Sequence, residues 1–112
     1  MTATELDVGE PDGLDDIRKH IDALDRRIVR LIAQREAWVR RAGGLKSDPS
    51  QAAAPERAAR VVDAAAAFAA EAGANPEVVR VTYVAMVAAF VQLEADTISE
   101  GSEAAETTAR QA

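Results

Sequence analysis

Apolar side chains recur at steps of three and four residues from Leu14 to Lys46. This spacing is typical of one face of an α-helix, and it continues for about eight turns. A glycine pair, Gly43-Gly44, is able to end or bend the helix just before Lys46. A small monomer cannot cover so long an apolar face, so the pattern predicts pairing with a long helix of a partner subunit. The apolar positions are Leu14, Ile17, Ile21, Leu24, Ile28, Leu31, Ile32, Trp38 or Val39, and Ala42.

Two shorter helices follow a loop over residues 47–54, which is rich in Pro, Ser and Asp. The first is expected over residues 55–72, because it begins with a proline and Gly73 suits its C-cap. The second begins after Asn75, a suitable N-cap, and is expected to end near Ser99. No strand pattern or tandem repeat is visible, so the fold class is all-α, a three-helix protomer with one long N-terminal helix.

The composition also favours an oligomer. The chain has 112 residues, enough for one small domain, which is 48% hydrophobic and 4% aromatic. Much of the apolar content is alanine, which buries little area, so the core of a single copy would be thin. We expect a helical domain over residues 14–100 that shares its core in a homodimer. An acidic, Gly- and Pro-containing leader over 1–13 is expected to be disordered, and residues 101–112, without apolar periodicity, to form a flexible tail.

Charge and hydropathy argue against several partners. The net charge is −6, and no broad basic surface is evident, so nucleic acid is not expected. Residues 1–13 lack the basic and apolar regions of a signal peptide. The weakly polar run over residues 78–93 contains Arg80, Thr82 and Tyr83, which argues against a membrane span. The sequence therefore predicts a cytoplasmic protein without a membrane partner.

Three cations in the long helix suggest an anion site. Arg18, Arg35 and Lys46 are separated by 17 and 11 residues. In one helix, Arg35 and Lys46 would share a face with Cα atoms ~16 Å apart, leaving room between their side chains for a small dianion. Arg18 would lie ~25 Å from Arg35 and well round the helix. If all three serve one site, Arg18 comes from a second copy.

A carboxylate on the third helix is the other notable polar group. Glu94 follows Val87, Phe90 and Val91 at helical spacing, which puts it on the apolar face. It is either solvated at a frayed helix end or buried for a reason, and burial would disfavour its ionised form and let it donate a hydrogen bond. The helices offer no Cys or Ser nucleophile beside a base, His20 is expected to be solvated, and no metal-ligand set is evident. No metal or other cofactor is expected.

These residues carry a family resemblance. The pattern I-R-x-x-I-D-x-L-D over residues 17–25, the spacing of the three cations, and P-E-R over residues 55–57 resemble the all-α chorismate mutase family. The similarity covers residues 14–99. It implies an intertwined homodimer of three-helix protomers, with two active sites that are each completed by an arginine from the other subunit.

The resemblance also implies roles for individual residues. Arg18 from the partner and Arg35 would bind the carboxylates of a dianionic, chorismate-like substrate. Lys46 would donate a hydrogen bond to its ether oxygen. Glu94 would face the same oxygen, where many members have glutamine and some have glutamate. An ionised Glu94 would repel an oxygen that gains negative charge, so it must be protonated to help.

The short loop and the sequence APER over residues 54–57 are closer to one branch of the family. That branch contains isochorismate pyruvate lyase, and mutases of specialised metabolism that act on chorismate or 4-amino-4-deoxychorismate. By position, Glu56 would contact the ring hydroxyl, with Arg57 as a neighbouring support. The loop lacks the acidic residue that housekeeping mutases have before the second helix. The resemblance therefore does not identify the substituent on the ring of the substrate.

Three functions remain open at this point. The first is a chorismate mutase, or a mutase of the 4-amino analogue, which needs no nucleophile, metal or redox cofactor. The second is isochorismate pyruvate lyase, which would give salicylate and pyruvate, and which glutamine at position 94 would have favoured. The third is a non-catalytic helical dimerisation module whose cations are ordinary helix-face charges.

Overall fold

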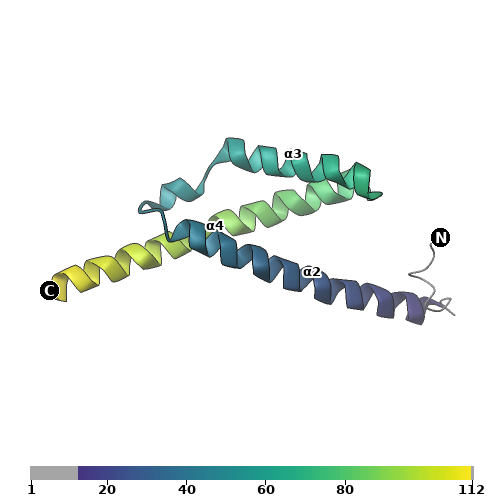
Figure 1. The fold of residues 1–112 in the computed structure, drawn as a ribbon, viewed down its shortest axis with the longest axis horizontal. Coiled ribbons are helices and arrows are strands. Elements are labelled where there is room, and N and C mark those ends of the chain that lie inside the picture. Colours follow the sequence, from purple (N-terminus) through teal and green to yellow (C-terminus); the bar gives the residue numbers. More distant parts are fainter. Residues whose placement is uncertain (1–12, 112) are drawn as a thin grey trace. The chain divides into compact units, whose positions relative to one another are not determined.

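The fold is all-α, as the sequence predicts. A computed structural model describes residues 13–111, and over these residues it contains three α-helices, one short 3-10 helix and no strand (Figure 1). The predicted leader falls almost wholly on residues 1–12, outside the described part of the chain. The helices are α2 (Leu14–Gly43), η1 (Pro49–Ala52), α3 (Pro55–Ala72) and α4 (Pro76–Gln111).

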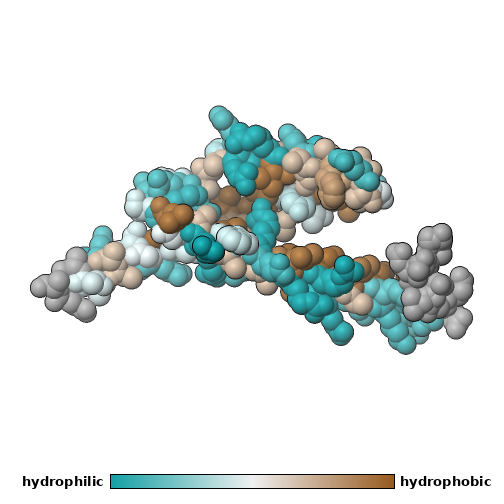
Figure 2. All heavy atoms as spheres, in the orientation of Figure 1, coloured by the Kyte–Doolittle hydropathy of each residue, from teal (hydrophilic) through white to brown (hydrophobic). Residues whose placement is uncertain are grey.

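The chain divides into two units, one ending at Arg35 and the other starting at Glu36. The described part of the first unit is essentially the N-terminal portion of α2, whose first turn carries Asp15 and Asp16 at the positive end of the helix dipole. Its apolar face is open to solvent, and Figure 2 shows hydrophobic side chains gathered along one side of this helix. The exposed apolar residues are Leu14, Ile17, Ile21, Leu24, Ile28, Leu31 and Ile32.

The second unit is built on a hairpin of α3 and α4, which lie side by side (Figure 1). Gly73 ends α3 in the left-handed conformation, with φ of 81°, where a residue without a Cβ is favoured. Asn75 caps α4 by accepting hydrogen bonds from the backbone N–H groups of Glu77, at 2.8 Å, and Val78, at 3.3 Å. The predicted caps of both helices are therefore confirmed. The apolar core of this unit is small and includes Ala52, Val62, Ala66, Ala69, Val87, Phe90 and Ile98.

The glycine pair ends α2 before Lys46. The helix stops at Gly43, and the N–H groups of Leu45 and Lys46 donate to the carbonyls three residues back, Ala42 and Gly43, at 3.1 and 3.2 Å. Bonds of this shorter span tighten the last turn and turn the chain out of the α-helix. The prediction that one helix carries Lys46 is wrong, because this lysine lies in the loop that follows.

The expected end of the last helix near Ser99 is also wrong. Helix α4 continues to Gln111, so the region predicted as a loose tail is helical as far as the structure describes it. The segment after Ser99 is rich in alanine and glutamate, which favour helix, and a single Gly101 costs only about 1 kcal/mol relative to alanine. Its side chains from Glu103 on are exposed where they are described, which explains why the sequence there shows no apolar periodicity.

Part of α4, Pro76–Thr108, is long and apolar enough to cross a membrane by length and composition alone. The core helix of a soluble protein passes the same test, so one such helix is weak evidence. The absence of a membrane partner and the cytoplasmic location stay predictions.

Candidate functional site

Lys46 and Glu94 form an ion pair between the loop after α2 and the middle of α4. The Lys46 Nζ donates to the Glu94 Oε1, although 48 residues separate the two in sequence. The Glu94 side chain is 11% exposed and that of Lys46 33% exposed. Of the two alternatives for Glu94, burial is therefore the one observed. A carboxylate so far removed from water needs a charged or hydrogen-bonded partner, which Lys46 provides.

A glycine brings the end of α2 into contact with the helix that carries Glu94. Gly43 is buried, and a Cβ added to it would lie 3.3 Å from both the Glu94 Cγ and the Thr97 Cγ2. The Thr97 hydroxyl donates to the Leu93 carbonyl at 2.9 Å and accepts a longer hydrogen bond from the Arg40 Nη1 at 3.4 Å. The missing side chain at Gly43 thus allows the backbone to lie directly against the carboxylate-bearing turn of α4.

The loop that carries Lys46 is ordered by a capping box around η1. The Asp48 carboxylate accepts from the Ser50 backbone N–H at 3.0 Å. The Gln51 Oε1 accepts from the backbone N–H groups of Ser47 and Asp48, both at 3.0 Å. The Ser50 N–H, followed by the Ser50 side chain, lowers the pKa of Asp48 below its ordinary value of 3.8. The loop is short, and its polar groups are largely satisfied within it.

Arg18 and Arg35 lie on α2 in the first unit. The Arg18 side chain is 65% exposed, and its Nη1 lies 3.9 Å from the Asp15 Oδ1, one turn earlier. Arg35 is half-buried and interacts with a neighbouring group. Because 17 residues of one helix place their Cα atoms ~25 Å apart, α2 does not bring these two arginines to one small ligand.

Glu56 and Arg57 lie in the first turn of α3 and are exposed. The structure gives neither a contact with the Lys46–Glu94 pair, so their assigned roles rest on the family resemblance. Across residues 13–111, no group of three or more His, Cys, Asp or Glu side chains is arranged to hold a metal ion.

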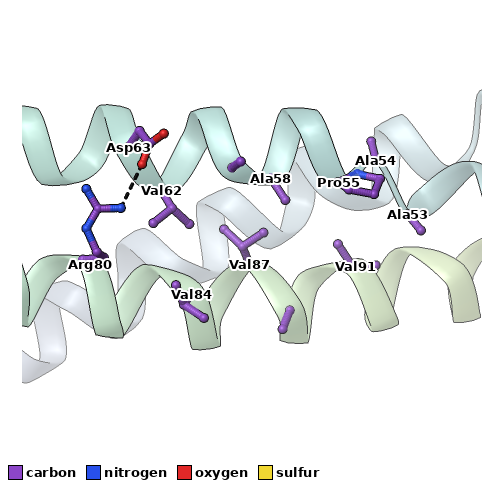
Figure 3. A pocket seen from close by; sticks show the side chains of 12 residues that line it. Ala53, Ala54, Pro55, Ala58, Val62, Asp63, Arg80, Val84, Val87 and Val91 are labelled. Atoms are coloured by element: carbon purple, nitrogen blue, oxygen red, sulfur yellow. Dashed lines mark hydrogen bonds and ion pairs between the residues drawn. The ribbon is translucent and has the colours of Figure 1, made fainter.

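A separate groove of 540 Å³ runs between α3 and α4. Small apolar side chains point into it, among them Val62, Val84 and Val87, and the Asp63–Arg80 ion pair, at 2.8 Å, lies at one end (Figure 3). The lining offers one cation, and that cation is already paired with a carboxylate. The groove therefore suits apolar side chains better than a dianion.

Sequence reasoning missed the residues that support the site. Asp48 and Gln51 had a detectable signal, since an Asp followed three residues later by Gln is a capping-box pattern. Gly43 was noted as a helix breaker, but its close approach to Glu94 depends on how α2 and α4 meet and has no local signal. The same is true of Thr97.

Comparison with protein families decides which family these residues represent. The family model of chorismate mutase type II matches residues 17–95. The chain belongs to the chorismate mutase type II family. Lys46 and Glu94 both lie within the matched region, as do Arg18, Arg35, Glu56 and Arg57. A comparison with curated proteins finds no match.

Proposed function

We propose that this family member is a chorismate mutase acting on chorismate or its 4-amino analogue. The observation that carries the proposal is the part-buried Lys46–Glu94 pair, formed by a loop lysine and an apolar-face carboxylate within the family match. Such a pair places a hydrogen-bond donor of fixed position in a region with little water. Preorganised donors of this kind stabilise charge that develops in a transition state.

The reaction suits the residues available. In chorismate, the ether C–O bond to the ring breaks while a C–C bond forms between the enolpyruvyl methylene carbon and the ring. The ether oxygen gains negative charge as its bond lengthens, and Lys46 donates to it as a compact cation. Glu94, in its protonated form, donates to the same oxygen. In the free protein the two side chains form an ion pair with Glu94 as the carboxylate. In this mechanism Glu94 takes up one proton from solvent when substrate binds and the ether oxygen takes its place between the two side chains.

The two carboxylates of the substrate require a clamp that selects the folded, reactive conformer. Arg35 and the Arg18 of a second copy fill this role in our proposal, because the arginine fork binds a carboxylate through two parallel hydrogen bonds. The two side chains are too far apart along α2 to act on one substrate from one protomer. A homodimer with shared sites removes this difficulty.

Two surfaces of the protomer support the dimer. The first is the exposed apolar face of α2, and the second is the groove between α3 and α4, whose lining includes the exposed Val84. Covering the exposed half of one Leu or Ile side chain contributes roughly 1 kcal/mol, and α2 presents many of them. The apolar groove fits such side chains from a second copy, and this would thicken the alanine-rich core.

Product analysis tests the function. Purified protein is incubated separately with chorismate, isochorismate and 4-amino-4-deoxychorismate, and the products are identified by mass. Prephenate or the amino-prephenate supports the proposal. Salicylate with pyruvate would select the lyase instead, and no product from any of the three would select the non-catalytic module.

A mixing experiment tests the shared site. Arg18→Ala and Lys46→Ala variants, each inactive in our proposal, are unfolded together, refolded as a 1:1 mixture and assayed. If Arg18 acts on the partner's site, each mixed dimer has one intact site, and about a quarter of the wild-type activity returns. If Arg18 acts within its own subunit, every site lacks one residue and the mixture stays inactive, which would refute the shared site.

A further inference from the structure

Ser47, the residue after Lys46, has both of its backbone polar groups hydrogen-bonded. The N–H of Ser47 donates to the Gln51 Oε1 at 3.0 Å, within the loop. The carbonyl of Ser47 accepts from the Ser102 hydroxyl at 3.1 Å, from α4. The N–H of Lys46 itself donates to the Gly43 carbonyl at 3.2 Å. The backbone on both sides of the lysine is thus tied down, once by a residue far away in sequence.

Ser102 lies outside the region that matches the family. The match ends at residue 95, whereas α4 continues to Gln111. Between these two points Ile98 is 2% exposed and Ser102 is half-buried, and α4 packs against η1. In this stretch the Ser102 hydroxyl bonds to Ser47, so the loop that carries Lys46 is one of its contacts.

The hydrogen bond of Ser102 is not the one that a helical serine usually makes. A serine inside a helix commonly bonds to the carbonyl four residues earlier in its own helix. Thr97 does so in α4, through its bond to the Leu93 carbonyl. Ser102 instead bonds to a carbonyl 55 residues away. The bond thus joins the helix to the loop rather than satisfying the helix itself.

We propose that Ser102 is a positioning residue for Lys46. The lysine ammonium sits on a flexible four-carbon stem, so the place it occupies depends on how firmly its backbone is held. Ser102 holds the Ser47 carbonyl from the α4 side, and Gln51 holds the Ser47 N–H from the loop side. Together they keep the ammonium at the turn of α4 that carries Glu94. The proposal rests on the proposed function, because it assigns Lys46 to the reacting oxygen.

Ser102→Ala tests this with little risk to folding, since alanine favours helix more than serine does. We expect kcat to fall roughly three- to tenfold, the effect of one lost hydrogen bond, with KM nearly unchanged because the carboxylate clamp is untouched. Ser102→Thr keeps the hydroxyl and should restore most of kcat. Ser99→Ala is the matched control, being the same substitution in the same helix about one turn earlier.

Amide hydrogen exchange of the free protein provides a readout that does not depend on catalysis. The Ser47 and Asp48 amides should exchange faster in Ser102→Ala, but not in Ser102→Thr or Ser99→Ala. Wild-type kcat or wild-type exchange in Ser102→Ala would overturn the proposal, and so would an equal fall of kcat in Ser99→Ala. A wild-type protein inactive on all three substrates would overturn the proposed function, and the exchange comparison would still decide whether Ser102 orders the loop.

Discussion

Adding one methyl group at Gly43 should disturb the site without unfolding the protein. In Gly43→Ala the new Cβ would meet the Glu94 Cγ and the Thr97 Cγ2, each at 3.3 Å. Contacts this close require the Glu94 or Thr97 side chain to move by a few tenths of an ångström. Thr97 is held by its bond to the Leu93 carbonyl, so we expect the longer Glu94 side chain to move. The perturbation therefore acts directly on the ion pair with Lys46.

The effect on stability is expected to be small because two contributions oppose each other. Gly43 lies within α2 and has no positive φ, so alanine there favours the folded helix by roughly 0.5–1 kcal/mol. Overpacking in a tight contact costs about 1–3 kcal/mol, and the small movement needed here favours the lower end. The free energy of unfolding should change by less than ~1.5 kcal/mol.

The effect on catalysis should be measurable even where the two opposing contributions to stability cancel. A misplacement of 1 Å in a catalytic group can cost about 100-fold in rate, so a few tenths of an ångström at Glu94 should lower kcat roughly three- to tenfold. Steady-state kinetics with the substrate found by product analysis measures kcat and KM. Thermal unfolding, recorded on the same preparations, measures stability.

Gly44→Ala is the matched control, one residue further along. A Cβ at Gly44 would make ordinary contacts, the closest at 3.4 Å from the Arg41 carbonyl, and Gly44 also lacks a positive φ. This variant should keep wild-type kcat and be slightly more stable, by roughly 0.5 kcal/mol. Unchanged kcat in Gly43→Ala, or an equal loss in Gly44→Ala, would show that the close approach of Gly43 does not position Glu94.

Four further predictions follow from the site and the helices. Lys46→Ala and Arg35→Ala should each remove nearly all turnover, and full turnover in either would refute its assignment. Glu94→Gln, which places a permanently neutral hydrogen-bond donor at this position, should keep turnover, and a loss of nearly all turnover in this variant would rule out the neutral-donor role. The pKa of Asp48 is lowered in the folded loop, so its contribution to loop order is present above 3.8 and is lost as pH falls through the lower folded value. The protection of the loop amides, measured relative to intrinsic exchange at each pH, should therefore fall with this titration in the wild type but not in Asp48→Asn. Gly101→Ala should raise the free energy of unfolding by about 1 kcal/mol, because alanine favours helix over glycine and the added Cβ meets nothing within 4 Å. A lower melting temperature in this variant would contradict the prediction.

Both ends of α3 and the start of α4 were predictable from the sequence because their signals are local. Pro55 begins α3, Gly73 ends it in the left-handed conformation, and Asn75 caps α4, each through atoms a few residues apart. The end of α4 was not predictable by the same rules. A lone Gly101 and the loss of apolar periodicity suggest a tail, yet alanine and glutamate keep the exposed segment helical.

For the candidate site, the meeting of Lys46 and Glu94 was predictable, whereas its supporting contacts were not. The apolar-face position of Glu94 and the family resemblance placed it opposite Lys46, and the structure brings these two side chains together. The supporting contacts were not predictable, because they join segments far apart in sequence. Ser102 has no motif that points to the carbonyl of Ser47, and the closeness of Gly43 to Glu94 appears only when α2 and α4 are packed.

The charges of the proposed site explain why a carboxylate is tolerated beside the reacting oxygen. Arg18 of the partner, Arg35 and Lys46 carry three positive charges, and an ionised Glu94 reduces the total to two, which equals the charge of the dianion in magnitude. Protonation of Glu94 leaves the site more positive by one charge beside the ether oxygen, where partial negative charge develops, while the substrate keeps its overall double negative charge because the ring gains the matching positive charge. Glu94→Gln would hold the site permanently in this more positive state. We therefore expect the variant to bind the dianion more tightly, with a lower KM than the wild type, and a KM equal to or above that of the wild type would refute this charge balance.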